Sequence, residues 1–178
     1  NRLMGIMLQE GGIYPSSRVG ELVRQYCALY GNGVDADTLI NRVGLQGVVS
    51  TTYRRLSGGE KQRVQLARVL AQIWQPCELG EQFLVLDEPT SAFDLSHQKL
   101  TLDIVRQLAD KSVGVVMVVH DLNLAARCAD NLVVIDAGVI AAQGCPEAVL
   151  TEALIDKVFG VKSIIAQHPE TKRPLVIT

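Results

Sequence analysis

Two adjacent carboxylates, Asp87 and Glu88, follow the apolar run 83–86 and precede Pro89. An apolar run of this length, bounded by a proline, predicts a strand buried on both faces of a parallel sheet. Ligands of open α/β folds bind at the carboxyl ends of such strands. Because adjacent side chains on a strand point to opposite faces, one carboxylate can face a hydrated metal ion while the other orients a water. For these two residues alone, the alternative is an acidic turn without chemistry.

A second polar group, Ser57-Gly58-Gly59-Glu60, opens a predicted helix that continues to about Trp74. Ser57 and Glu60 have the spacing of a capping box. Glycine in a helix weakens it by up to about 1 kcal/mol, so two glycines in the first turn need another reason. Glycine allows the backbone to approach a ligand closely, and a helix N-terminus binds anions. The segment therefore indicates phosphate recognition, with a merely well-capped helix as the alternative.

Single polar residues end two further predicted strands. Gln9 follows the short apolar segment 6–8, and His120 follows the segment 113–119, which we expect to be fully buried. A lone residue of either type at a strand end is more often structural than functional. The helix predicted over 94–110 lies between the strand of the carboxylate pair and that of His120, and such a crossover implies parallel strands. We therefore expect His120 to leave the same sheet edge as the carboxylate pair.

The segment between residues 19 and 45 predicts a small helical unit, because its apolar side chains recur with a helical period. We expect a turn at 31–33, a cap at Asp37 or Thr38 for a second helix, and an end at Gly44. The remaining elements are expected in the carboxyl-terminal part: helices at 122–129, 146–150 and 152–159, a hairpin with a three-residue turn at 136–138, and a loose strand and tail at 163–178.

Composition excludes several classes of function. The net charge is −2 and aromatic residues make up 4% of the chain, so neither a basic footprint nor a base-stacking surface for nucleic acid is expected. The four cysteines are widely spaced, which favours reduced thiols over disulfides or a zinc site. The longest apolar stretch is far too short to span a membrane, and we expect no signal peptide. We expect a soluble, intracellular protein.

The segments LSGGEKQR (56–63), FLVLDEPTSAFD (83–94) and VVHD (118–121), in this order, resemble the ATP-binding subunits of ABC transporters. The resemblance covers essentially all 178 residues. It implies an α/β fold of the P-loop NTPase type, with a partial parallel sheet flanked by helices and a small helical subdomain. It divides the chain into a strand segment (1–12), the helical subdomain (13–56), the rest of the ATPase core (57–162) and a tail (163–178).

The resemblance also implies activity, partners and location. The chain would be an ATPase subunit that uses ATP and Mg²⁺, pairs with a second copy, and docks on transmembrane permease subunits. It would be cytoplasmic and peripheral on the inner face of the plasma membrane. By resemblance, Ser57, Gly58, Gly59 and Glu60 would form the signature that binds the γ-phosphate of ATP held by the opposite subunit. Asp87 would hold Mg²⁺ through water, Glu88 would be the general base, and His120 would contact the γ-phosphate. Gln9 would link metal and permease, and Asp94 would belong to the loop at the dimer interface, although Phe93 replaces the usual leucine.

One departure from the family is informative. Its phosphate-cradling loop, GxxxxGK followed by Ser or Thr, occurs nowhere in the chain, so we expect the sequence to be the carboxyl-terminal part of a nucleotide-binding domain. Anion binding at a helix terminus contributes about 0.3–1 kcal/mol, or up to about 2 kcal/mol when partly buried. Even millimolar affinity needs about 4 kcal/mol. We therefore predict that this chain alone neither binds ATP tightly nor hydrolyses it.

Different segments of the chain resemble transporters of different substrate classes. Segments 63–76, 77–82 and 118–130 resemble subunits of heme and iron-siderophore importers, whereas the opening 7–23 resembles drug exporters, so a fused chain is one alternative. The importer resemblance spans more residues, and we favour heme or iron-complex import. Two other classes remain open: a soluble ABC-type ATPase of DNA repair or translation, and a non-catalytic docking or dimerisation module. Intact Glu88 and His120 speak against the latter, while the missing loop speaks for it.

Overall fold

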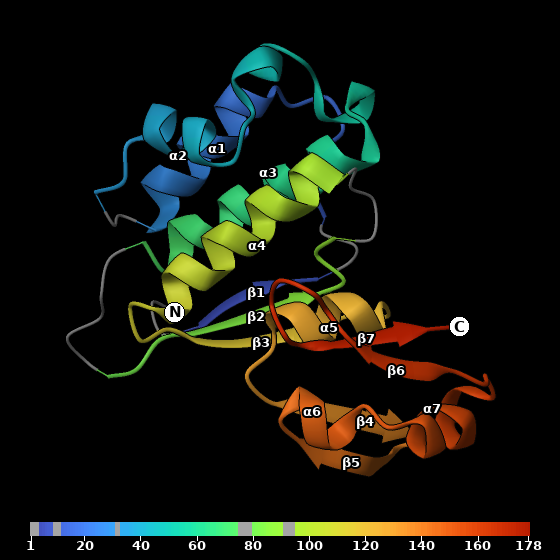
Figure 1. The fold of residues 1–178 in the computed structure, drawn as a ribbon. Coiled ribbons are helices and arrows are strands. Elements are labelled where there is room, and N and C mark those ends of the chain that lie inside the picture. Colours follow the sequence, from blue (N-terminus) through green and yellow to red (C-terminus); the bar gives the residue numbers. More distant parts are fainter. Residues whose placement is uncertain (1–3, 9–11, 31–32, 75–79, 91–94) are drawn as a thin grey trace. The chain divides into compact units, whose positions relative to one another are not determined.

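The computed structural model describes residues 4–8, 12–30, 33–74, 80–90 and 95–178 (Figure 1). The chain forms two compact units, Asn1–Val118 and Val119–Thr178, and each is described here by itself. The first unit contains strands β1 (Met4–Met7), β2 (Phe83–Asp87) and β3 (Gly114–Val118), helices α1 (Val19–Tyr30), α2 (Ala36–Arg42), α3 (Gly58–Gln72) and α4 (Leu95–Ala109), and two short 3-10 helices at Gln46–Val48 and Tyr53–Arg55. The second contains α5 (Leu122–Cys128), β4 (Leu132–Asp136), β5 (Val139–Gly144), α6 (Pro146–Val149), α7 (Glu152–Phe159), β6 (Ile164–Gln167) and β7 (Pro174–Ile177).

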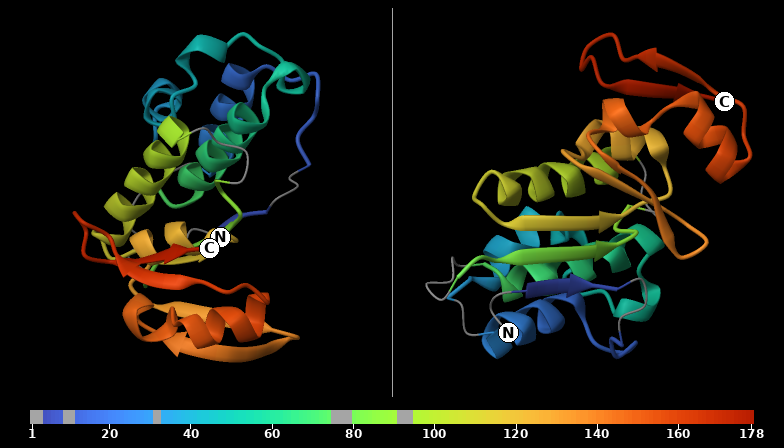
Figure 2. Two further views of the ribbon diagram at one scale, coloured as in Figure 1. Left: turned by 45° about the vertical axis from the view of Figure 1, so that its right-hand side comes forward. Right: turned by 90° about the horizontal axis from the view of Figure 1, so that it is seen from below.

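A parallel three-stranded sheet organises the first unit. Its order is β1-β2-β3, and the right-hand view of Figure 2 shows the strands side by side. Both pairings are parallel, with Leu86 opposite Met7 on one side and Met117 on the other. The parallel direction was predicted from the crossover helix α4 and is confirmed. Parallel strands end at one edge, so the carboxyl ends of β1, β2 and β3 lie together.

The described chain covers one face of this sheet more completely than the other. Leu84 and Leu86 of β2 are fully buried, because α3 and α4 pack on their side (Figure 1). Phe83 is 40% exposed, and Val116 and Val118 of β3 are 56% and 48% exposed. Alternate side chains of a strand point to opposite faces, so these residues lie on the other face. The prediction that both strands are buried on both faces is therefore wrong for this chain.

The helical region between residues 19 and 45 forms as its apolar pattern predicted, and it packs on α3. Val64, Ala67 and Leu70 of α3 are buried in the same cluster as Leu22 and Val23 of α1. The cap of α2 differs from the prediction of Asp37 or Thr38. The capping residue is Asp35, whose extended backbone lets its carboxylate accept a hydrogen bond from the Thr38 N–H at 2.8 Å.

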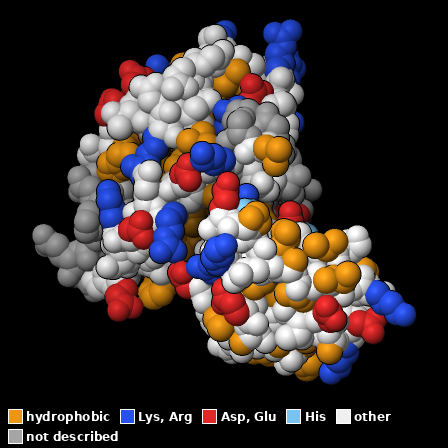
Figure 3. Space-filling model, viewed as in Figure 1, with side chains coloured by type: hydrophobic (Ala, Val, Ile, Leu, Met, Phe, Trp, Pro, Cys, Tyr) orange, Lys and Arg blue, Asp and Glu red, His pale blue; other side chains and the backbone are white. Residues whose placement is uncertain are grey.

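The second unit contains two antiparallel hairpins. In the β4–β5 hairpin, Asp136 pairs with Val139, so the turn has two residues, Ala137 and Gly138, rather than the predicted three. Both have positive φ (48° and 80°), which suits the right-handed twist of a two-residue hairpin. Residues 163–178 form the hairpin β6–β7 instead of a loose strand and tail. Its Val176 joins a buried cluster with Ala126, Leu150 and Ile155, which supplies the hydrophobic stabilisation that a lone strand lacks. Figure 3 shows many hydrophobic side chains at the surface of this unit.

Two further expectations concern membranes and thiols. Within the described residues, no helix has the length and hydrophobicity needed to cross a bilayer. Cys27, Cys128 and Cys145 are free cysteines, while Cys77 lies outside the described residues. Burial raises the pKa of both the Cys27 and Cys128 thiols, which keeps them in the less reactive neutral form.

Candidate functional site

The amino-terminal tip of α3 is organised by a reciprocal cap. The Ser57 hydroxyl accepts a hydrogen bond from the Glu60 N–H at 3.3 Å, and the Ser57 N–H donates to the Glu60 carboxylate at 2.8 Å. This confirms the predicted capping box. The first-turn N–H groups of Gly58 and Gly59 lie where a helix offers no intrahelical acceptor. The tip therefore combines glycine backbone, a serine hydroxyl and the positive end of a helix dipole, which together favour an anion.

The carboxyl end of β2 carries the carboxylate pair. Asp87 is the last residue of the strand and pairs with Val118 of β3. The next residue, Glu88, donates its N–H to the Val118 carbonyl at 3.1 Å and has a φ of +45°. Positive φ is uncommon for a residue with a side chain and costs energy, and such strained residues concentrate at functional sites. Pro89 is buried and follows at once.

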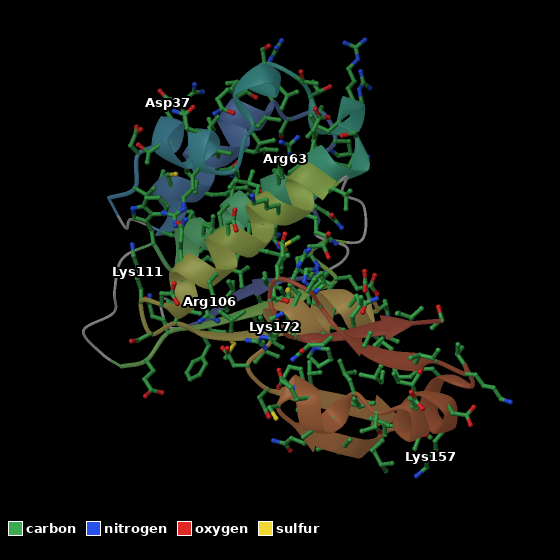
Figure 4. All side chains as sticks on the ribbon, in the orientation of Figure 1. Asp37, Arg63, Arg106, Lys111, Lys157 and Lys172 are labelled. Atoms are coloured by element: carbon green, nitrogen blue, oxygen red, sulfur yellow. The ribbon has the colours of Figure 1, made fainter. Side chains whose placement is uncertain are left out.

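A side chain of α3 connects these two features. The Gln62 amide Nε2 donates a hydrogen bond to the Glu88 carbonyl oxygen at 3.3 Å. Next to it, the buried Arg63, labelled on α3 in Figure 4, donates from Nη1 to the Gly44 carbonyl at 2.7 Å. The signature helix therefore contacts the carboxylate strand on one side and the helical region on the other. Neither residue was predicted from the sequence to have this part, although Arg63 is a charged residue within a buried helical stretch, and such a residue needs specific partners.

Tyr53 and Lys61 lie near the same helix tip. The Lys61 ammonium is 5.8 Å from the centroid of the Tyr53 ring, within the range of a cation–π contact. Burial raises the pKa of the Tyr53 hydroxyl, while a side-chain hydrogen bond with Gln65 opposes that rise. Tyr53 thus remains neutral at physiological pH and serves as a packing surface beside the tip.

The predicted site residues fall into separate groups. The first unit holds Ser57, Gly58, Gly59, Glu60, Asp87 and Glu88, and Gln62 joins the signature helix to the strand end. His120 belongs to the second unit, where it directly precedes Asp121, the N-cap of α5. Its cooperation with Glu88 stays a prediction. Gln9 and Asp94 lie outside the described residues, as does the neighbouring Phe93.

The chemistry of these groups fits a magnesium–nucleotide site in one respect. Among the described residues, no group of three or more His, Cys, Asp or Glu side chains could hold a metal ion by itself. Mg²⁺ keeps several waters and takes one or two carboxylates together with substrate phosphates. The single carboxylate of Asp87, at the strand end, matches that demand without a dedicated metal cage.

Comparison with known proteins shows the family that the sequence motifs indicated. The family model described as "ABC transporter" matches residues 1–91. Proteins named hemin import ATP-binding protein HmuV are similar in sequence. The one from Hahella chejuensis is 51% identical over 70% of this chain and 49% of its own length. The one from Pseudomonas putida is 42% identical over 99% of this chain and 71% of its own length. The chain thus spans about half of the length of the first relative. The alignment with the second relative covers 99% of this chain, so it includes both the importer-like segments and the exporter-like opening of this chain.

Solved structures agree on the fold. A metal-chelate type ABC transporter in an inward-facing conformation is 21% identical, with a TM-score of 0.74 over 98% of this chain and 72% of that one. An ATP-binding subunit of an ABC transporter has a TM-score of 0.68 over 90% of this chain and 64% of that one. At this identity the likeness concerns the fold alone, and it confirms the predicted α/β architecture.

Proposed function

From the premise that the chain belongs to the ABC transporter family, we propose that it supplies the signature to one ATP-hydrolysing site and the carboxylate pair to another, with a second copy completing each site. The observation that carries the proposal is the direct contact between α3 and the strained residue after β2. The glycine tip of α3 suits a phosphate, and Glu88 is a carboxylate at a ligand-binding sheet edge. The Gln62 hydrogen bond links the two within one chain.

Each residue has a distinct part in the proposed reaction. Ser57, Gly58 and Gly59, capped by Glu60, take the γ-phosphate of ATP held by a second copy of the chain. At the other ATP of the pair, Glu88 accepts a proton from the attacking water, and His120 donates a hydrogen bond to the γ-phosphate. Mg²⁺, held through water by Asp87, would neutralise phosphate charge as it develops.

The remaining family roles complete the proposal. Gln9 couples the nucleotide site to the permease, and Asp94 contacts the second copy. Residues 13–56 form the subdomain that docks on the transmembrane subunits, residues 1–12 and 57–162 belong to the ATPase core, and 163–178 form the terminal segment. Through the permease the protein is peripheral on the cytoplasmic face of the membrane.

We further propose that the transported substrate is heme or a related iron complex. The support is the function for which the relatives are named, hemin import, at 51% and 42% identity. Drug export is the competing substrate class, since residues 7–23 resemble that branch. Reconstituting the ATPase with its permease in vesicles separates them: heme uptake driven by ATP supports the proposal, while ATP-driven drug extrusion without heme uptake contradicts it.

The catalytic proposal has its own test. The protein encoded by the whole gene, including any coding sequence upstream of residue 1, is purified. Its ATP binding and ATP turnover are then measured. Turnover that disappears in Glu88→Gln while ATP binding persists supports the assignment. A wild-type protein that assembles with its partners but binds no ATP would instead favour the non-catalytic docking module. The isolated 178-residue chain should show no micromolar ATP binding in a titration, because it lacks the phosphate-cradling loop.

A further inference from the structure

The hairpin β6–β7 is bound to α5, the helix that begins two residues after His120. The side chain of Asn123, in the first turn of α5, makes two hydrogen bonds with the backbone of Val176 in β7. Its Nδ2 donates to the Val176 carbonyl at 2.9 Å, and its Oδ1 accepts from the Val176 N–H at 2.7 Å. The amide of Asn123 thus occupies the place of a neighbouring strand along the edge of β7.

A second contact fixes the other end of the helix. The Arg173 guanidinium, just before β7, donates from Nη1 to the Ala129 carbonyl at 2.6 Å, at the carboxyl terminus of α5. A cation at that end also interacts favourably with the helix dipole. The six residue steps from Asn123 to Ala129 span about 9 Å of helix, and the three steps from Arg173 to Val176 span about 10 Å of strand. The strand and the helix are therefore matched in length and joined at both ends.

The hairpin is itself held in the second unit. Ile165 pairs with Val176 across β6–β7, and its N–H donates to the Glu152 carboxylate at the start of α7, at 3.4 Å. Val176 packs with the fully buried Ala126 of α5 and with Ile155 of α7. A substitution that weakens α5 would therefore also disturb its contacts with the hairpin β6–β7 and with α7.

Helix α5 has only seven residues, Leu122–Cys128. Isolated helices shorter than about 12 residues are marginal in water, so the order of α5 depends on its packing. Its N-cap is Asp121, whose carboxylate accepts from the N–H groups of Asn123 at 2.8 Å and Leu124 at 3.0 Å. His120 immediately precedes this cap. Any fraying of the first turn would release the backbone that places the His120 side chain.

We propose that Asn123 is a positioning residue for His120, and that hairpin β6–β7 acts through it to hold the switch histidine in place. The inference rests on the proposed function, in which His120 contacts the γ-phosphate. It assigns residues 163–178 a part in turnover, whereas residue patterns predicted only a terminal strand and tail.

The first test is kinetic and uses the ATPase that contains the full chain. Asn123→Ala should lower kcat about tenfold and change KM for ATP less than about twofold, since nucleotide binding remains while a transition-state contact is misplaced. Arg127→Ala, at an exposed position on the same helix, is the matched control and should keep kcat near wild type. Arg173→Ala should behave like Asn123→Ala, and Arg173→Lys should recover most of the loss because lysine still donates to helix-terminal carbonyls.

The second test separates positioning from general destabilisation. In a His120→Ala background, Asn123→Ala should lower kcat by less than about twofold, because the group that it positions is already gone. A tenfold loss in that background would overturn the inference, as would an unchanged kcat in Asn123→Ala with His120 present.

A third measurement does not depend on ATP hydrolysis. Amide exchange at 121–125 should be about tenfold faster in Asn123→Ala than in Arg127→Ala, because losing two hydrogen bonds favours local opening. Equal exchange rates would overturn the inference even if ATP hydrolysis is confirmed. An inactive wild-type protein with the predicted exchange difference would contradict only the proposed function.

Discussion

The side-chain amide of Gln62 donates a hydrogen bond to the carbonyl oxygen of Glu88 across 3.3 Å. On the other side of the same residue, the Glu88 N–H donates to the Val118 carbonyl at 3.1 Å. Neighbouring elements therefore hold the Glu88 backbone from both sides while its φ stays at +45°. The helix that carries the signature segment thus helps to fix the residue proposed as the general base.

Replacing Gln62 with glutamate should uncouple the helix from the strand end. Gln62→Glu keeps the shape but turns the donor into a charged acceptor that faces the Glu88 carbonyl, so we expect kcat to fall about tenfold with KM for ATP little changed. Steady-state ATPase assays measure both. Gln72→Glu is the matched control, because Gln72 lies on the same helix and bonds the Tyr30 hydroxyl instead. Equal turnover in the two variants would contradict the coupling.

Glu88→Gln should remove the general base and leave the nucleotide bound. The expected loss in kcat is about 10²–10⁴-fold, the usual contribution of a positioned base. Single-turnover hydrolysis and ATP titration distinguish the two effects. Unchanged turnover would exclude Glu88 from the reaction.

Glu88→Gly should stabilise the fold while it abolishes turnover. Glycine adopts positive φ without steric cost, so the free energy of unfolding should rise by about 1 kcal/mol. Urea denaturation measures the change. Ser112→Gly is the control, because Ser112 also has positive φ (65°) but lies in the turn after α4, and it should gain stability without losing activity. A loss of stability in Glu88→Gly would mean that the carboxylate itself supports the fold.

Alanine at Gly58 or Gly59 should have opposite effects on stability and on function. Both residues lie in the first turn of α3, where alanine is the better helix former by up to about 1 kcal/mol. Each added methyl group would obstruct the close approach of a phosphate, so turnover should fall as stability rises. Thermal unfolding and ATPase assays on the same samples provide the comparison. Full activity in both variants would leave the glycines with no role at the phosphate.

The contact between Gly44 and Arg63 should stabilise the helical region on α3. Arg63→Ala removes a buried charged hydrogen bond and should cost about 2 kcal/mol. Gly44→Ala should also destabilise, because φ is +69° and the new Cβ would lie 3.2 Å from Arg63 Nη1. Gly160→Ala is the control: its φ is +67°, but a Cβ there would meet open space. If both glycine variants lose the same stability in urea, the close approach of the new Cβ to Arg63 adds no cost.

Acid should weaken the cap of α2. Hydrogen bonds from the Thr38 N–H and hydroxyl lower the pKa of the Asp35 carboxyl below its ordinary 3.8. A lowered folded-state pKa contributes stability that is present above 3.8 and is lost as pH falls through the folded value. The free energy of unfolding, measured by denaturation at a series of pH values, should therefore fall less steeply with acidification in Asp35→Asn than in wild type. Identical pH slopes would show that the cap is not coupled to folding.

The sequence by itself determined the family and most of the elements. The capping box of Ser57 and Glu60, the apolar run before Asp87 and the helical crossover after it depend on neighbouring residues, and local pattern suffices for such features. The parallel direction of the strands followed from that crossover. The order of the signature, acidic and histidine segments was enough for the family assignment.

Only the tertiary structure decided which residues support the proposed chemistry. The contacts of Gln62 with Glu88, Arg63 with Gly44 and Asn123 with Val176 join positions 26, 19 and 53 residues apart. No local periodicity records such pairs, because they depend on how packed elements face one another. The positive φ of Glu88 also depends on distant segments, whose hydrogen bonds hold a backbone conformation that a residue with a side chain disfavours. The hairpin β6–β7 likewise depends on burial against residues far away in the sequence.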